Sequence, residues 1–245
     1  SKIHITSQKE MIESSRYREY KEGSQFTYDP TLEPDKDYLQ RLTRILSINS
    51  NVEMSKFLSG SKGAYTSKTN YLDLSTKEYF TEKYNYVNEF DKMSRLDKYK
   101  VISPTHFLGS NNENLTELYD AYVNNISLNS HAFDDVGDSN NYHGAIYNKN
   151  LNKAISYNEL MESMRHELQI FGDPTIFSGR KISLKLSPAI DPELEKEGYE
   201  NNNTPDYDKF LSGDYIIASV QHVFDDEYFA NILVKKDSFS YNLDT

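Results

Sequence analysis

The sequence predicts a mainly β fold with some helix (α+β), in which a small tube-like antiparallel β-barrel follows a hairpin and helix region with a long loop excursion. Three observations predict it. Apolar and polar residues alternate in ISLKL, and the largely apolar, strand-like run GDYIIASVQHVF follows it, both in the last third of the chain. A further hairpin pattern lies near residue 70, and a helical pattern lies near residue 155. Four strands with one apolar face cannot hide that face as a flat sheet, so they roll up or pack on another element.

The first predicted segment is 1–60. Ser7 and Glu10 have the spacing of a capping box, which predicts a helix from residue 8 to about 21, stopped by Gly23. Residues 38–52 alternate as a strand, and residues 53–64 predict a short helix ending at glycine. Because the chain lacks an initial Met and begins with a strand-like run, we expect it to continue from a missing first barrel.

The second predicted segment, 61–141, contains a hairpin and a polar excursion. Residues 65–74 and 79–86 are rich in Tyr and Leu, and 75–77 form the turn between them. Residues 91–141 are rich in Asn, Ser, Asp and Gly and predict a long excursion, with one candidate helix at 113–125.

The third predicted segment, 142–245, is a helix followed by the barrel domain. Apolar residues near one side predict a helix at 145–163, and a strand follows up to a turn at Gly172, Asp173 and Pro174. The next strand places Ile182, Leu184 and Leu186 on one face. Residues 188–205 are acidic and predict an exposed loop. A hairpin within 208–239 closes the barrel.

Composition excludes several classes of function. The net charge of −11 disfavours binding to nucleic acid or to an anionic membrane. The absence of Cys excludes disulfides and thiolate zinc sites, and fits assembly in a reducing cytoplasm. No apolar run approaches the roughly 20 residues that span a bilayer, so we expect no membrane anchor. Twenty Tyr residues suit extended contact surfaces.

His222 is the foremost candidate for a catalytic residue. Both faces of its strand are mostly apolar, which predicts that the strand is covered on both sides. Catalysis would need an orienting carboxylate and a nucleophile nearby, and Asp225 and Asp226 lie in the turn. We therefore interpret His222 as a hydrogen-bonded residue of the barrel wall.

Two other patterns resemble metal sites. RHEL, at 165–168, resembles the start of a zinc-protease helix, but Ile170 stands where the second His is needed. The acidic run HAFDDVGDS, at 131–139, lacks the distal Glu of a calcium loop. No nucleotide-binding glycine loop occurs. We expect no catalytic, cofactor-binding or metal-binding residues, and no enzyme.

The C-terminal third contains the segments GDPTIFSGRKISLKL, LSGDYIIASVQHVF and YFANILVKKDSF in this order, and GAYTSKTNYLDLSTKEYFTEKYNYVNEF precedes them. The order of these motifs resembles that of baseplate hub proteins of contractile-tailed bacteriophages. Together the segments cover roughly residues 60–239. The residues of this structural motif are Gly172, Asp173, Pro174, Gly179, Leu211, Ser212, Gly213, Tyr215, His222, Lys236, Asp237 and Ser238.

This resemblance implies a structural role in the virion, at the tail baseplate, after assembly in the bacterial host cytoplasm. Hub proteins form homotrimers that join the hexameric tail tube to the trimeric central spike. The implied partners are the tail tube protein, the central spike protein and other baseplate subunits. DNA passes through the hub without specific binding.

Three alternatives stay open. Spike or hub proteins of type VI secretion and other contractile injection systems share the plan of the baseplate hub. A tail-associated cell-wall hydrolase fragment would need a carboxylate pair or a metal triad, and the sequence presents neither. A carbohydrate-binding β-module usually displays exposed Trp, and Trp is absent.

Overall fold

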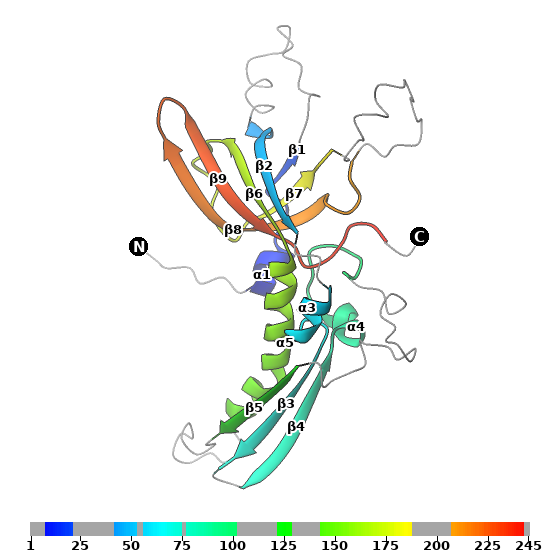
Figure 1. Ribbon diagram of the computed structural model, residues 1–245. Helices are drawn as coiled ribbons and strands as arrows, with labels where there is room; N and C mark the ends of the chain where they lie inside the picture. The colour runs from blue at the N-terminus through cyan, green and yellow to red at the C-terminus, as the bar shows by residue number, and fades with distance from the viewer. Residues whose placement is uncertain are drawn as a thin grey trace. The chain divides into compact units, whose positions relative to one another are not determined.

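The chain folds as two compact units (Figure 1). The computed structural model describes residues 8–21, 42–52, 56–74, 77–101, 122–128, 143–187 and 207–242. One unit, here called the large unit, consists of Ser1–Val52, Ser94–Val101 and Met164–Thr245. The other, the small unit, consists of Glu53–Met93 and Ile102–Ser163. Each unit is therefore assembled from segments that are separated in the sequence, whereas the three predicted segments were continuous.

The large unit is built on a six-stranded sheet. Its strand order is β1-β7-β8-β9-β6-β2, and every neighbouring pair is antiparallel except β1 and β7, which are parallel. The strands are β1 (Arg18–Lys21), β2 (Ile45–Val52), β6 (Met164–Phe171), β7 (Lys181–Lys185), β8 (Gly213–Phe224) and β9 (Tyr228–Lys235).

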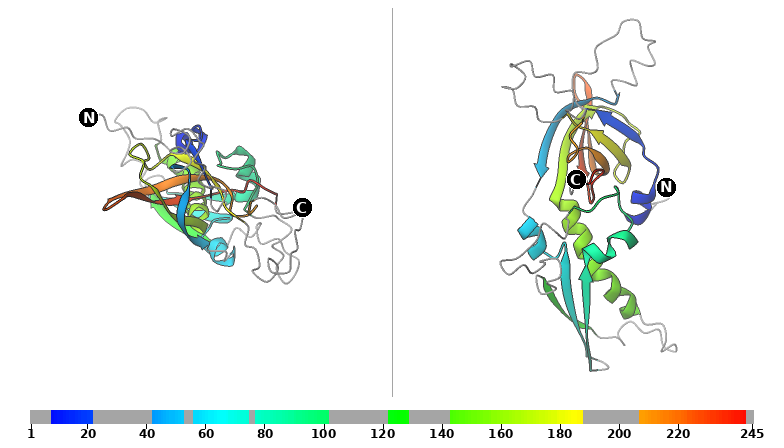
Figure 2. Two further views of the ribbon diagram at one scale, coloured as in Figure 1. Left: turned by 90° about the horizontal axis from the view of Figure 1, so that it is seen from above. Right: turned by 90° about the vertical axis from the view of Figure 1, so that its right-hand side faces the viewer.

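This sheet curls into a half-barrel, as the right-hand view of Figure 2 shows. The prediction of a mainly β fold with some helix is confirmed. The sheet is open among the described residues, because β1 and β2 stand at its two ends and do not pair with each other. One parallel pair also distinguishes it from the purely antiparallel barrel that the sequence predicted.

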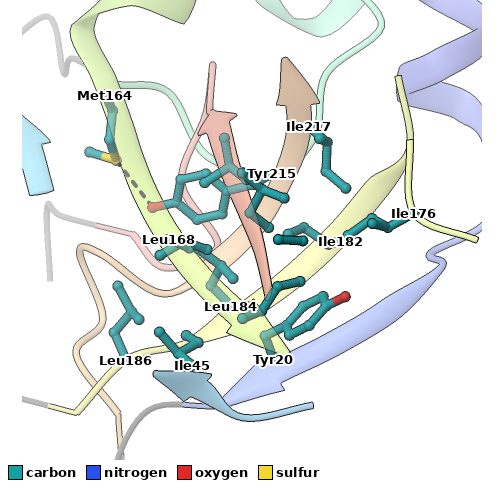
Figure 3. Packing of buried hydrophobic residues seen from close by; sticks show 14 of the residues in the cluster. Tyr20, Ile45, Met164, Leu168, Ile176, Ile182, Leu184, Leu186, Tyr215 and Ile217 are labelled. Atoms are coloured by element: carbon teal, nitrogen blue, oxygen red, sulfur yellow. Dashed lines mark hydrogen bonds between the residues drawn. The ribbon is translucent and has the colours of Figure 1, made fainter. Parts of the chain in front are cut away.

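The concave side of the curled sheet holds the core of the large unit (Figure 3). Ile182, Leu184 and Leu186 are all buried there, as their alternation predicted. Tyr20 and Tyr215 are fully buried beside them and fill the space between strands from opposite ends of the chain. Burying each of the aliphatic side chains contributes about 1.5–3 kcal/mol relative to leaving it exposed.

The long hairpin of β8 and β9 is covered on both sides along only part of its length. Residues 214–217 are buried, but from Ala218 onward β8 alternates between exposed and half-buried residues on both faces. The pairing of β7 with β8 ends at Lys181 opposite Ile216, and an irregularity follows between Ile217 and Ser219. The prediction that both faces are covered is therefore wrong for the outer half of β8.

The N-terminal helix is shorter than the sequence predicted. Helix α1 (Gln8–Glu13) ends where Ser14 Oγ donates to the Met11 carbonyl oxygen over 2.6 Å. Residues 18–21 form β1 instead of continuing the helix, and β1 pairs in parallel with β7. Burial of Tyr20 in the sheet core outweighs the weak local helix signal of a segment with few apolar residues.

The small unit contains a three-stranded sheet of order β4-β3-β5. The predicted hairpin is confirmed as β3 (Thr66–Asp73) and β4 (Glu78–Asn85), and β5 (Val123–Leu128) adds in parallel to β3. The unit also contains α3 (Lys56–Ser61), α4 (Tyr86–Glu89), the short 3-10 helix η1 (Phe90–Lys92) and α5 (His143–Ser163).

Two of the predicted helices are confirmed, and one is partly wrong. Helix α3 is followed by Gly63 at a φ of +91°, and α5 closely matches the predicted 145–163. The candidate helix at 113–125 conflicts with β5, which begins at Val123; its earlier residues lie outside the described residues. So do the acidic run 131–139 and the acidic loop 188–205.

Candidate functional site

The residues that carry the motif meet at one end of the large sheet. Ser212 and Gly213 lead into β8, while Lys236, Asp237 and Ser238 follow β9. They enclose Asp97, which comes from the segment Ser94–Val101. We call these six residues, Asp97, Ser212, Gly213, Lys236, Asp237 and Ser238, the buried polar junction.

Lys236 is the centre of this junction. Its side chain is 1% exposed, and its Nζ donates to the Ser212 carbonyl oxygen over 2.7 Å. The same Nζ lies 3.4 Å from Oδ2 of Asp97, and 5.0 Å from the centre of the Tyr215 ring. A buried ammonium is costly unless it is paired and hydrogen-bonded, and here both conditions are met.

A second set of hydrogen bonds ties the segment Ser94–Val101 to the sheet. Asp237 Oδ1 accepts from the Leu96 amide over 3.1 Å, and Ser238 Oγ accepts from the Asp97 amide over 2.7 Å. An isolated antiparallel bridge joins Tyr99 to Phe239. The Lys-Asp-Ser motif therefore fixes the segment Ser94–Val101 to the end of strand β9.

Gly213 is required by the geometry of the junction. Its φ of +137° is a backbone conformation that residues with a side chain rarely adopt. A Cβ atom at this position would lie 2.5 Å from Asp97 Oδ2 and 2.5 Å from Lys236 Nζ. The glycine therefore lets the ion pair approach the backbone of β8.

The charges in the junction are strongly affected by burial. Burial lowers the pKa of Lys236, and the carboxylates of Asp97, Asp214 and Asp237 oppose that change. Burial also raises the pKa of Asp97, against the attraction of Lys236. Because the ammonium is almost fully enclosed, we interpret the pair as a structural clasp and not as a group that meets a substrate.

His166 and Tyr215 form a second buried contact next to the junction. His166 Nε2 lies 3.0 Å from the Tyr215 hydroxyl, which donates to the Leu211 carbonyl oxygen over 2.5 Å. The other ring nitrogen, Nδ1, lies 2.9 Å from Ser50 Oγ. Burial, with a smaller effect of Lys236, lowers the pKa of His166 to about 4. The imidazole is therefore neutral at physiological pH.

The zinc-protease pattern RHEL is excluded as a helical site because it lies in strand β6. His166 lies on the same face of β6 as the buried residues Met164, Leu168 and Ile170, and this spacing of two residues was the signal that pointed to a core position. The RHEL pattern around His166 pointed only to a potential metal ligand and did not predict the contact with Tyr215.

Asp173 organises the turn that follows β6. Oδ1 accepts hydrogen bonds from the amide and the hydroxyl of Thr175, over 2.9 and 2.6 Å. Oδ2 accepts from the Tyr17 hydroxyl over 2.9 Å and lies 2.7 Å from Arg18 Nη1. Burial raises the pKa of Asp173, but these hydrogen bonds and the Arg18 charge outweigh it and hold the pKa below its ordinary value.

Two glycines and Pro174 complete this turn. A Cβ on Gly172 would lie 2.1–2.3 Å from the ring of Tyr228. Gly179 has a φ of +89°, and its amide donates to the Ile217 carbonyl oxygen over 2.8 Å. Pro174 lies in the turn between β6 and β7. The Gly-Asp motif thus fixes the N-terminal segment and the β8–β9 hairpin to the same turn.

His222 stands apart from both clusters. It lies on the exposed outer half of β8, where its Nδ1 is hydrogen-bonded to the Tyr228 hydroxyl over 2.9 Å. Within the described residues, neither Asp225 nor Asp226 bonds to this imidazole, so the orienting carboxylate of a catalytic His is not in place. The structure brings together the other motif residues in two groups but leaves His222 outside them.

Potential metal ligands are dispersed in the described ranges. No group of three or more His, Asp or Glu gathers there to hold a metal ion. Among the helices described, none has the length and apolar character to cross a membrane.

Comparisons with known proteins place tail proteins among the structural neighbours. The tail protein from Neisseria meningitidis MC58 has 8% identity and a TM-score of 0.39 over 91% of this chain and 45% of its own. The 43 kDa tail protein of prophage MuSo2 from Shewanella oneidensis has 10% identity and a TM-score of 0.33 over 79% and 41%. The chain thus spans less than half of either protein, and TM-scores below 0.5 do not establish a shared fold. No family model and no curated protein matches the sequence.

Proposed function

We propose that the chain is a structural component of a bacteriophage tail, in the form of a homotrimeric baseplate hub. In this role it joins the hexameric tail tube to the trimeric central spike and lines the conduit for DNA. The observation that carries the proposal is the convergence of the motif residues. Leu211 to Gly213, Tyr215 and Lys236 to Ser238 come from separate segments and meet around Asp97.

The chemistry of this convergence supports a mechanical role. Its hydrogen-bond donors and acceptors are directed at one another: Lys236 Nζ at Ser212 and Asp97, and Asp237 at Leu96 and Ser238. Groups that already satisfy each other in the core stabilise one arrangement of the chain. A subunit that stands between a tube and a spike needs such a fixed shape.

The charge of the chain supports a conduit through which DNA passes without binding. A net charge of −11 repels a polyanion, and a repelled polyanion does not adhere to the wall. Replacing acids that face the conduit by Asn or Gln is expected to slow DNA ejection. Unchanged ejection would contradict this part of the proposal.

The oligomeric state of the purified chain tests the proposal. Size-exclusion chromatography with light scattering is expected to give three copies of the 28.4 kDa chain per particle. A monomer across the accessible concentration range would contradict the hub. A peptidoglycan zymogram is the second arm: no clearing is expected, and clearing would favour the cell-wall hydrolase over the hub.

A further inference from the structure

The curled sheet leaves two backbone edges open among the described residues. One is the outer edge of β2, at the end of the sheet. The other is the outer half of β8, residues 218–224, because β7 pairs with β8 only up to Ile216 and the last backbone bonds on that side involve Ile217. Each edge presents unpaired N–H and C=O groups that can join another strand.

Both edges lack the residues that normally prevent strand addition. The sequences ILSINSNV of β2 and ASVQHVF of residues 218–224 contain no charged residue, no Pro and no Gly. By contrast β1, at the opposite end of the sheet, reads REYK and is charged at three of its four positions. Soluble proteins protect open edges with charge or Pro, so two uncharged edges indicate strands that become paired in the assembly.

The direction of the strands makes the two edges complementary. The outer part of the sheet has the order β8-β9-β6-β2, and each neighbouring pair is antiparallel. With four alternating strands, β8 and β2 run in opposite directions. A copy rotated about an axis along the strands therefore brings its β8 antiparallel to β2 of its neighbour. Seven residues face eight, so the two edges also match in length.

We propose that β2 of one copy pairs with residues 218–224 of β8 in the next copy. The choice of β8 as the partner of β2 rests on the proposed function. A three-fold hub requires a heterologous interface, in which two different surfaces meet. Pairing of β2 with β2 would bury one edge in a two-fold dimer and leave the β8 edge open. Pairing of β2 with β8 covers both edges with one repeated contact.

The chain contains no Cys, so engineered disulfides can test this contact directly. Asn49→Cys on β2 is combined with Gln221→Cys or with His222→Cys. Successive residues of a strand point to opposite faces, so one of the two β8 positions lies on the same face as position 49. Mild oxidation of one double variant is expected to give a covalently closed trimer, and each single variant is expected to stay uncrosslinked.

Two outcomes of the disulfide test would overturn the proposal. A disulfide dimer of the Asn49→Cys single variant would show β2 pairing with β2. A third uncharged edge strand, β5 (VNNISL), provides the matched control. Crosslinking of Asn49→Cys with Ser127→Cys on β5, and not with either β8 position, would assign the β2 edge to another partner.

A second readout uses charge in place of a covalent link. The double substitution Ser219→Lys and Gln221→Lys changes two exposed side chains, and it is expected to weaken trimer formation at least tenfold. Thr81→Lys on β4, an edge strand that already carries charged residues, is expected to leave trimer formation unchanged. If the doubly substituted chain still forms trimers and neither Cys pair crosslinks, the edge contact is wrong while the hub function stands. A monomeric unmodified chain contradicts the hub function itself.

Discussion

Lys236 and Asp97 face each other inside the protein, with Nζ 3.4 Å from Oδ2 and the lysine side chain 1% exposed. The two residues come from segments far apart in the sequence, and their contact fastens Ser94–Val101 to the end of the sheet. Asp97 also accepts a hydrogen bond from the Asp214 amide over 3.0 Å. This carboxylate therefore joins the segment Ser94–Val101 both to the start of β8 and to the end of β9.

Asp97→Ala is expected to destabilise the protein by about 3–5 kcal/mol, because it leaves the Lys236 ammonium buried without its partner. The matched control is Lys92→Ala, which breaks the exposed pair of Lys92 and Glu89 at 2.8 Å and is expected to cost less than about 1 kcal/mol. Urea unfolding followed by circular dichroism measures both. Equal losses for the two variants would contradict the role of the junction.

Gly213→Ala is expected to destabilise the fold by about 1–3 kcal/mol or more. Its backbone φ would be strained, and its Cβ would overlap with the side chains of Asp97 and Lys236. Gly60→Ala is the matched control. Its Cβ would meet only the Tyr65 ring, at 3.6 Å, and α3 gains a better helix former. Thermal unfolding should separate the two variants, and a neutral Gly213→Ala would refute the requirement for glycine.

The protein is expected to lose stability as the pH falls from 6.5 toward 4. Burial lowers the pKa of His166 from 6.5 to about 4 in the folded state, so the unfolded chain takes up the proton first. The free energy of unfolding carries the full contribution of neutral His166 above pH 6.5. It decreases by about 3 kcal/mol between pH 6.5 and pH 4, as the unfolded chain binds the proton.

Comparison of the wild type with His166→Gln isolates this effect from the titration of Asp97 and Asp173. The slope of unfolding free energy against pH between 6.5 and 4 is expected to be smaller in His166→Gln. An unchanged slope in His166→Gln would show that the buried imidazole does not set the acid sensitivity.

His222→Gln is expected to leave the oligomer intact or mildly weakened, because the change removes one exposed hydrogen bond, with the Tyr228 hydroxyl. Tyr228→Phe removes the same bond from the other side and is expected to behave alike. Light scattering measures both variants. A turnover activity of the wild type that disappears in His222→Gln would overturn the interpretation of His222 as a structural residue.

Local patterns predicted most of the strands and the helices α3 and α5. Ile182, Leu184 and Leu186 alternate with polar residues, and all three are buried. The predicted hairpin strands 65–74 and 79–86 match β3, which ends at Asp73, and β4, which begins at Glu78. These features depend on neighbours in the sequence, so periodicity is sufficient to find them.

The pairing of strands that are distant in the sequence could not be predicted from local patterns. Residues 18–21 form strand β1 because they pair with β7. Strand β5, which begins at Val123, likewise forms because it pairs with β3. Asp97 lay in a polar excursion with no local pattern, and only the fold brings it to Lys236. The motif residues were found by resemblance, but the carboxylate that pairs with them was not.

Imaging of the assembled particle tests the central claim most directly. Electron microscopy of tails that carry a tagged copy of this chain is expected to show three-fold density, and the tag, between the tail tube and the central spike. Tagged density elsewhere in the particle, or a symmetry other than three-fold at that position, would contradict the hub.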